Sequence, residues 1–134
     1  MKAGPMLFRV TAAAVFIQLV LGGLLTFDFI SAAPHIITGF IVFILAIVTM
    51  VLAITSKPVF KPIRMMSIIL VVLLLVQILL GFATLGSGSQ VLAWIHFVTA
   101  MAIYGLVVSG AVIAIRWDQM ARAGTGNLEV GMKK

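Results

Sequence analysis

This chain has no cysteine and few charged residues. It contains no cysteine, which excludes disulfide bonds, thiolate-bound zinc, iron–sulfur clusters and thiol redox chemistry. Only 9% of its 134 residues are charged, against about 25% in an average soluble domain. Hydrophobic residues make up 63% of the chain, and its mean hydropathy is +1.32. This composition excludes a water-soluble domain and places the chain in a lipid bilayer.

Four apolar stretches are each long enough to cross a bilayer core, which takes about 20 helical residues. They cover residues 6–27, 34–55, 65–85 and 91–115. In lipid, each span must satisfy its own backbone hydrogen bonds, so all four are expected to be helices. The sequence therefore predicts an all-α membrane protein, an antiparallel bundle of four transmembrane helices forming one domain over residues 1–134. The tail 116–134, with its A-G-T-G-N stretch, is expected to have little structure.

The basic residues all fall on one side of this predicted topology. They lie before or in the first turn of the first span, between the second and third spans, or after the fourth: Lys2, Arg9, Lys57, Lys61, Arg64, Arg116, Arg122, Lys133 and Lys134. Asp28 is the only charged residue on the opposite side. By the positive-inside rule, both termini are predicted to be cytoplasmic, in a multi-pass protein of the plasma membrane. Trp94 and Trp117 flank the fourth span, as interfacial anchors do. The positive-inside topology explains the basic residues behind the net charge of +6, so that charge does not indicate nucleic-acid binding.

The two halves of the chain repeat one another. I-Q-L-V-L-G-G at 17–23 corresponds to V-Q-I-L-L-G-F at 76–82, and P-H-I-I-T-G at 34–39 corresponds to I-H-F-V-T-A at 95–100. The repeat pairs Gln18 with Gln77, Gly22 with Gly81, His35 with His96, and Thr38 with Thr99. The only two histidines thus occupy equivalent positions, each near the outer end of a span. The repeat also indicates that the first stretch is a span and not a cleaved signal peptide.

Two histidines that face one another across a helical bundle are typical of a heme site, because a heme needs only two axial ligands. Pro34 suits a first helical turn, where the helix dipole favours the neutral, ligating imidazole of His35. Glycine lets a helix approach a porphyrin closely, although it equally suits helix packing. The predicted cofactor is one heme b per chain, with His35 and His96 as metal ligands and with Gly22, Gly81, Gln18, Gln77, Thr38 and Thr99 around it.

Other interpretations of these residues stay open. A histidine near a span end can sit at the headgroup level, and glutamines in lipid often form interhelical hydrogen bonds. Zinc fits less well, because it takes three or four protein ligands. Ser31, Ser87 and Ser89 either meet heme propionates or serve only as turn residues. One heme near the outer face would not carry electrons across the membrane.

The stretch Q-I-L-L-G-F-A-T-L-G-S-G-S-Q-V-L-A-W-I-H-F, residues 77–97, resembles a hairpin of the heme A synthases. In that family a Q-x-x-x-G element precedes, across an outer turn, a helix with a heme-ligating histidine. Full-length members fuse two four-helix halves, and half-size archaeal members assemble as oligomers. Residues 6–115 resemble one such half, which implies that His35 and His96 are the axial ligands.

The chain departs from the family's substrate-converting half at informative positions. That half has a glutamate three residues before its first outer histidine and an arginine directly after it. Here those positions are Ala32 and Ile36, and in the second hairpin Ala93 and Phe97. The outer cysteine pair of many members is also missing. The resemblance therefore implies the non-catalytic half that holds a cofactor.

Three functions follow as expectations. The first is a heme-b cytochrome that passes single electrons within or beside a respiratory chain. The second is an enzyme, a minimal heme A synthase that oxidises heme O to heme A as an oligomer. The third is a non-catalytic structural or assembly subunit of a respiratory oxidase. The expected partners are the lipid bilayer, further copies of the chain or a respiratory complex, and quinol or heme O. No span carries an interior charge, so a transporter or channel is not indicated.

Overall fold

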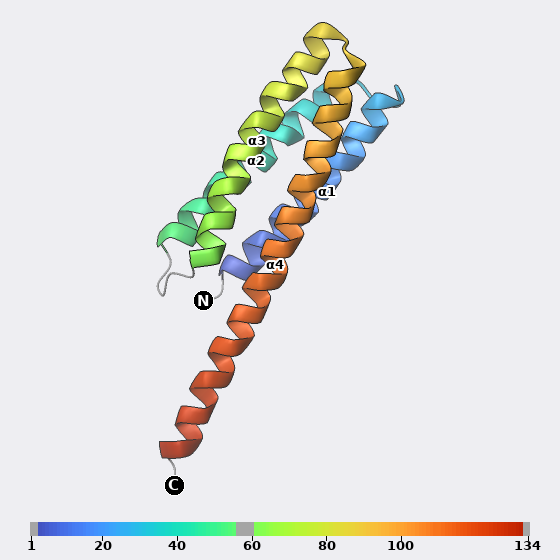
Figure 1. Ribbon diagram of the computed structural model, residues 1–134. Helices are drawn as coiled ribbons and strands as arrows, with labels where there is room; N and C mark the ends of the chain where they lie inside the picture. The colour runs from blue at the N-terminus through green and yellow to red at the C-terminus, as the bar shows by residue number, and fades with distance from the viewer. Residues whose placement is uncertain (1–2, 56–60, 133–134) are drawn as a thin grey trace.

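Four α-helices make up the protein, which a computed structural model describes over residues 3–55 and 61–132 (Figure 1). They are α1 (Ala3–Thr26), α2 (Ala32–Thr55), α3 (Lys61–Ser87) and α4 (Gln90–Met132). Each contains a segment long and apolar enough to cross a membrane: Met6–Thr26, Ala32–Thr55, Lys61–Ser87 and Gln90–Met120. The described residues contain no strand. The predicted four-helix membrane bundle is confirmed.

The four helices pack in a closed ring. Each helix contacts the next one in the chain, and α4 also packs against α1. Helix α1 is therefore diagonal to α3, and α2 is diagonal to α4. The α1–α2 and α3–α4 turns, residues 27–31 and 88–89, lie together at one end of the bundle, here called the turn end (Figure 1). The starts of α1 and α3 and the end of α2 lie at the other, here called the linker end.

The turns end the helices by two different backbone motifs. In the first turn Asp28 adopts a left-handed φ of 58°, and the Phe29 amide donates to the Leu24 carbonyl at 2.9 Å. This is the Schellman arrangement that closes many helices. In the second turn Gly88 takes the left-handed conformation, with a φ of 63°. The Ser89 hydroxyl then accepts from the Leu92 amide at 3.4 Å and caps the start of α4.

Buried residues occur from the middle of the bundle to the linker end, and nowhere else among the described residues. The aromatic ring of Phe8 fills the space beside Gly110, where a Cβ would lie 2.6 Å from the Phe8 Cε1 atom. The Thr11 and Thr49 hydroxyls meet at 3.2 Å and join α1 to α2 in the core. The buried set is Phe8, Thr11, Val15, Val42, Ala46, Thr49, Ile63, Ser67, Leu70, Leu74, Ile103, Val107, Gly110, Ala111 and Ala114.

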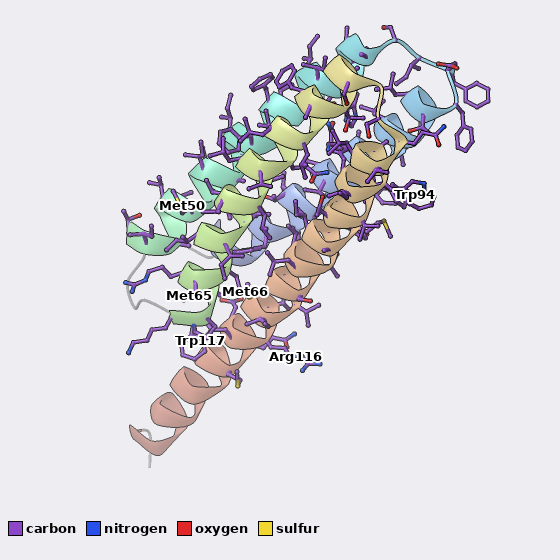
Figure 2. The ribbon with its side chains drawn as sticks, turned by 45° about the horizontal axis from the view of Figure 1, so that its top comes forward. Met50, Met65, Met66, Trp94, Arg116 and Trp117 are labelled. Atoms are coloured by element: carbon purple, nitrogen blue, oxygen red, sulfur yellow. The ribbon has the colours of Figure 1, made fainter. Side chains whose placement is uncertain are left out.

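Apolar side chains are exposed all around the bundle. They include isoleucine, valine, leucine and phenylalanine residues on all four helices. Contiguous apolar surface of this extent does not occur on soluble monomers and is the surface that lipid covers. Trp94 and Trp117 lie near opposite ends of the bundle, and Met50, Met65, Met66 and Arg116 lie towards the linker end (Figure 2). The two tryptophans thus take the positions expected of interfacial anchors.

Helix α4 continues well past the rest of the bundle and reaches Met132 (Figure 1). The expectation of little structure after Arg116 is therefore wrong for the backbone up to that residue; Lys133 and Lys134 lie outside the described residues. The physical reason is that extending an existing helix adds a hydrogen bond for each residue that is ordered, whereas starting a new one is costly. Two glycines in A-G-T-G-N lower the helix propensity but do not end the helix.

Candidate functional site

The turn-end half of the bundle encloses a cavity. None of residues 16–41 or 75–102 is fully buried. Their side chains surround a space of about 470 Å³ that is partly open to the outside. Four buried side chains form its floor: Val15, Val42, Leu74 and Ile103. The internal repeat pairs Val15 with Leu74 and Val42 with Ile103, so each helix contributes one residue to a symmetric layer.

The two histidines meet inside this cavity. His35 lies in the first turn of α2, and His96 lies in the second turn of α4. Because these helices are diagonal in the ring, the imidazoles approach from opposite sides. Their ring centres are 6.2 Å apart, and the ring planes are inclined by 73°. The structure thus brings together the two residues that the sequence paired.

This separation matches a shared metal ion. Two imidazoles that bind one metal from opposite sides, through nitrogens about 2.0 Å away, have ring centres about 6 Å apart. Rotation of each ring about its metal–nitrogen bond leaves the separation unchanged, so a steep angle between the planes is compatible. In the part of the chain that the structure describes, no three His, Cys, Asp or Glu residues group closely enough to hold a metal ion. A metal site here would have two protein ligands and would need a bound group to supply the others, as a heme does.

Gly22 and Gly81 make room for the two rings. A Cβ on Gly22 would lie 3.1 Å from the Cε1 atom of His35, and one on Gly81 would lie 3.2 Å from the Cε1 atom of His96. The sequence suggested that these glycines admit a flat macrocycle. Both do line the cavity, but the group that they admit closely is the imidazole of the neighbouring helix. The reason is that each ring folds back over the glycine of its own hairpin.

A glutamine and a threonine fasten each histidine backbone to its neighbouring helix. The Gln18 amide donates to the His35 carbonyl at 2.8 Å, and its oxygen accepts from the Thr38 hydroxyl. In the second hairpin, the Gln77 amide donates to the His96 carbonyl at 2.6 Å and its oxygen accepts from the Thr99 hydroxyl at 2.6 Å. These bonds link α1 to α2 and α3 to α4, as expected for polar side chains between helices in lipid. They set the depth of both imidazoles in the bundle.

Each imidazole has one enclosed nitrogen without a partner. The Nδ1 atoms of His35 and His96 are buried and form no hydrogen bond with any described residue. A buried polar atom left unpaired costs about 1–3 kcal/mol, and such atoms call for a functional explanation. The enclosure of Nδ1 leaves Nε2 as the nitrogen available to a ligand in the cavity.

The rest of the cavity wall offers little reactive chemistry. The lining residues include no carboxylate and no basic side chain besides the imidazoles. The Thr26 and Thr84 hydroxyls donate to the carbonyls of Gly22 and Leu80, so neither has a proton left to donate to a ligand. Ala93 and Ile36 belong to the lining and are apolar. The wall can therefore hold a large apolar group between two nitrogen ligands.

The serines of the turns have structural roles. The Ser87 hydroxyl donates to the Ala83 carbonyl at 2.7 Å and accepts from the Ser89 amide, while the Ser89 hydroxyl caps α4. Ser31 is exposed in the first turn. None of the three lines the cavity. Their geometry favours a role as turn residues over a role in binding heme propionates.

No family model, curated protein or solved structure matches this chain. The geometry of the histidine pair and its cavity is therefore what supports a functional assignment. Sequence reasoning missed two parts of the site. One is the floor of four buried residues. The other is Gly39, where a Cβ would lie 3.0 Å from the Gln18 amide nitrogen. Extending the repeat alignment by a few residues on either side pairs the floor residues and would have found them.

Proposed function

We propose that this chain is a membrane cytochrome that holds one heme b between His35 and His96 and passes single electrons within or beside a respiratory chain. One observation carries the proposal. Imidazoles from two diagonally opposed helices lie 6.2 Å apart, between ring centres, inside an apolar cavity. A heme bound there would supply a one-electron couple, and the apolar wall would tune its potential.

The size and the chemistry of the cavity fit that group. A volume of about 470 Å³ lies within the range of about 300–1,000 Å³ typical of small-molecule and cofactor sites. Gln18 and Gln77 hold the two histidine backbones in place, and Gly22 and Gly81 leave room for the two imidazole rings. Because the cavity is partly open, the polar edge of a macrocycle bound in it could reach the membrane surface near the turn end.

The apolar wall favours an electron carrier over a heme-modifying enzyme. Oxidation of a heme methyl group needs polar groups beside the substrate. Ala32, Ile36, Ala93 and Phe97 occupy the positions next to the histidines where the heme A synthase family places such groups. The resemblance to that family therefore supports the cofactor and not the reaction.

The packed half of the bundle favours a single heme. Between the cavity floor and the linker end the interior is filled by buried side chains, and neither histidine lies there. Electron exchange would therefore take place near the turn end. The positive-inside rule puts this end on the outer face of a plasma membrane, since basic residues gather at the linker end. Further copies of the chain or a respiratory complex would supply the next redox centre.

The test is the visible spectrum of the protein purified in detergent after expression with adequate heme. We expect a Soret band and a low-spin, bis-imidazole spectrum in the wild type. We expect both His35→Ala and His96→Ala to lose the low-spin form. Ser109→Ala is a matched control, because this exposed α4 hydroxyl donates to the Gly105 carbonyl, bonds no other described residue and lies outside the cavity. A wild type without a Soret band, or low-spin heme in both histidine variants, would contradict the proposal.

A further inference from the structure

The two glutamine–histidine pairs differ in one contact. The amide nitrogen of Gln18 lies 3.4 Å from the Nε2 atom of His35, in addition to its bond with the His35 carbonyl. The amide of Gln77 bonds the His96 carbonyl but forms no hydrogen bond with the His96 ring in the described residues. A primary amide has two hydrogens. On the His35 side one hydrogen serves the carbonyl, and the second is free to donate to the ring nitrogen.

The difference traces to Gly39 and Ala100, which are equivalent in the repeat. A Cβ on Gly39 would lie 3.0 Å from the Gln18 amide nitrogen, which is tighter than ordinary contact. Ala100 carries that methyl group at the corresponding position of α4, where it also lines the cavity. The absent side chain of Gly39 thus lets Gln18 settle beside the imidazole. In the second hairpin, the methyl group occupies the equivalent space.

This contact bears directly on ligation, because a ring nitrogen has one lone pair. The lone pair of Nε2 either accepts a hydrogen bond or binds a metal ion. Ligation by His35 must displace the Gln18 contact, whereas ligation by His96 displaces no hydrogen bond from Gln77. An otherwise symmetric site therefore has one ligand that is weaker than the other.

We infer that His96 is the firm ligand and His35 the displaceable one, and that the His35 side of the cavity is a site for a small neutral ligand of the carbon monoxide type. The inference rests on the proposed heme. In the exchange, carbon monoxide donates its lone pair to ferrous iron and the imidazole leaves with its own, so no electron is transferred. Gln18 and Gly39 act as positioning residues, since they work through His35.

The experiment is a carbon monoxide titration of the dithionite-reduced protein, followed by the shift of the Soret band. We expect the wild type to bind carbon monoxide with loss of one imidazole. Gly39→Ala moves the Gln18 amide away from His35, so several-fold more carbon monoxide should be needed to reach half saturation. The reciprocal Ala100→Gly lets Gln77 approach His96, so several-fold less should be needed.

A second pair of variants separates the ring contact from the shared bonds. Gln18→Leu and Gln77→Leu remove the same two kinds of bond, one to a histidine carbonyl and one to a threonine hydroxyl. Only Gln18→Leu also removes a contact with a ring. We therefore expect Gln18→Leu to raise the half-saturating carbon monoxide concentration several-fold more than Gln77→Leu does.

Three outcomes would overturn the inference. Equal carbon monoxide titrations in Gly39→Ala, Ala100→Gly and the wild type would show that the Gln18 contact does not weaken His35. A low-spin wild type that binds no carbon monoxide even at saturating concentration would show that neither ligand is displaceable. In both cases the proposed cytochrome stands, because heme is present. A preparation without any Soret band overturns the proposed function and this inference together.

Discussion

The two ends of this bundle are built from the same helices but in opposite ways. The linker-end half is filled by buried side chains, whereas no residue of the turn-end half is fully buried and a cavity takes the place of a core. The repeat is also close at the turn end, where glutamine, glycine, histidine and threonine recur in both hairpins. At the linker end, Phe8 corresponds to Ser67 and Thr49 to Gly110.

The difference indicates a division of labour between stability and function. Apolar packing at the linker end holds the four helices together, so the turn end is free to leave space. Polar bonds from Gln18 and Gln77 hold the helices there in place of a packed core. In lipid, close van der Waals packing and interhelical hydrogen bonds are the main forces between helices. The packed half relies mainly on the first, with one buried hydrogen bond between Thr11 and Thr49, and the turn-end half relies mainly on the second.

The largest effect should come from emptying the packed half. Phe8 is 1% exposed and fills the space beside Gly110. Phe8→Ala should lower the free energy of unfolding by about 3 kcal/mol or more, because it leaves a cavity that neighbours cannot close. Phe82 in the turn-end half is 50% exposed, and Phe82→Ala should cost about 1 kcal/mol through its ring contact with Phe40. Helical circular dichroism during denaturation in mixed micelles measures both. Equal losses would remove the proposed contrast between the halves.

A smaller effect is expected where a methyl group crowds the histidines. Gly22→Ala puts a Cβ 3.1 Å from the His35 ring and should cost about 1 kcal/mol, since the imidazole must move. It should also lower heme retention, which pyridine hemochrome absorbance measures. The matched control is Gly23→Ala, where a Cβ meets nothing within 4 Å. That variant should keep its heme and gain slightly in stability, because alanine favours a helix over glycine. If Gly23→Ala lost as much heme as Gly22→Ala, crowding of the ring would not be the cause.

The smallest effect should come from the buried hydroxyl pair. Thr11→Val and Thr49→Val each break the 3.2 Å contact between α1 and α2. Each should cost about 0.6 kcal/mol, the usual worth of an interhelical hydrogen bond in a membrane. The double variant should cost less than the two single variants together, because both single variants lose the same bond between Thr11 and Thr49. A double-mutant cycle on the same unfolding assay checks this, and strict additivity would contradict a coupling between the two threonines.

Much of the fold was predictable because its signals are local. Long apolar stretches without interior charge predicted four membrane helices, and the structure confirms them. The tail after Arg116 was predicted wrongly, since local propensity does not record that an existing helix extends cheaply. The pairing of His35 with His96 came from the repeat, and the structure brings the two rings together. Their role as heme ligands stays a prediction.

Other features were beyond the sequence because they depend on which helices pack together. The roles of Gly22 and Gly81 depend on the three-dimensional packing, because a glycine in a membrane helix can make room for a cofactor, an aromatic ring or a neighbouring helix. The contact between Gln18 and the His35 ring depends on Gly39, which lacks a side chain there and lies 21 positions after Gln18 in the sequence. No pattern of periodicity contains that information.

The amino-acid sequence by itself determined that the chain is a membrane protein, that it has four helices, and that its two hairpins are related. These properties follow from hydropathy, length and repetition, which act on each segment separately. Only the tertiary structure decided that α2 and α4 are diagonal, that their imidazoles lie 6.2 Å apart, and that one half is packed while the other is hollow. These properties depend on how side-chain volumes from four helices fit together, which is a property of the assembled bundle and of no single segment.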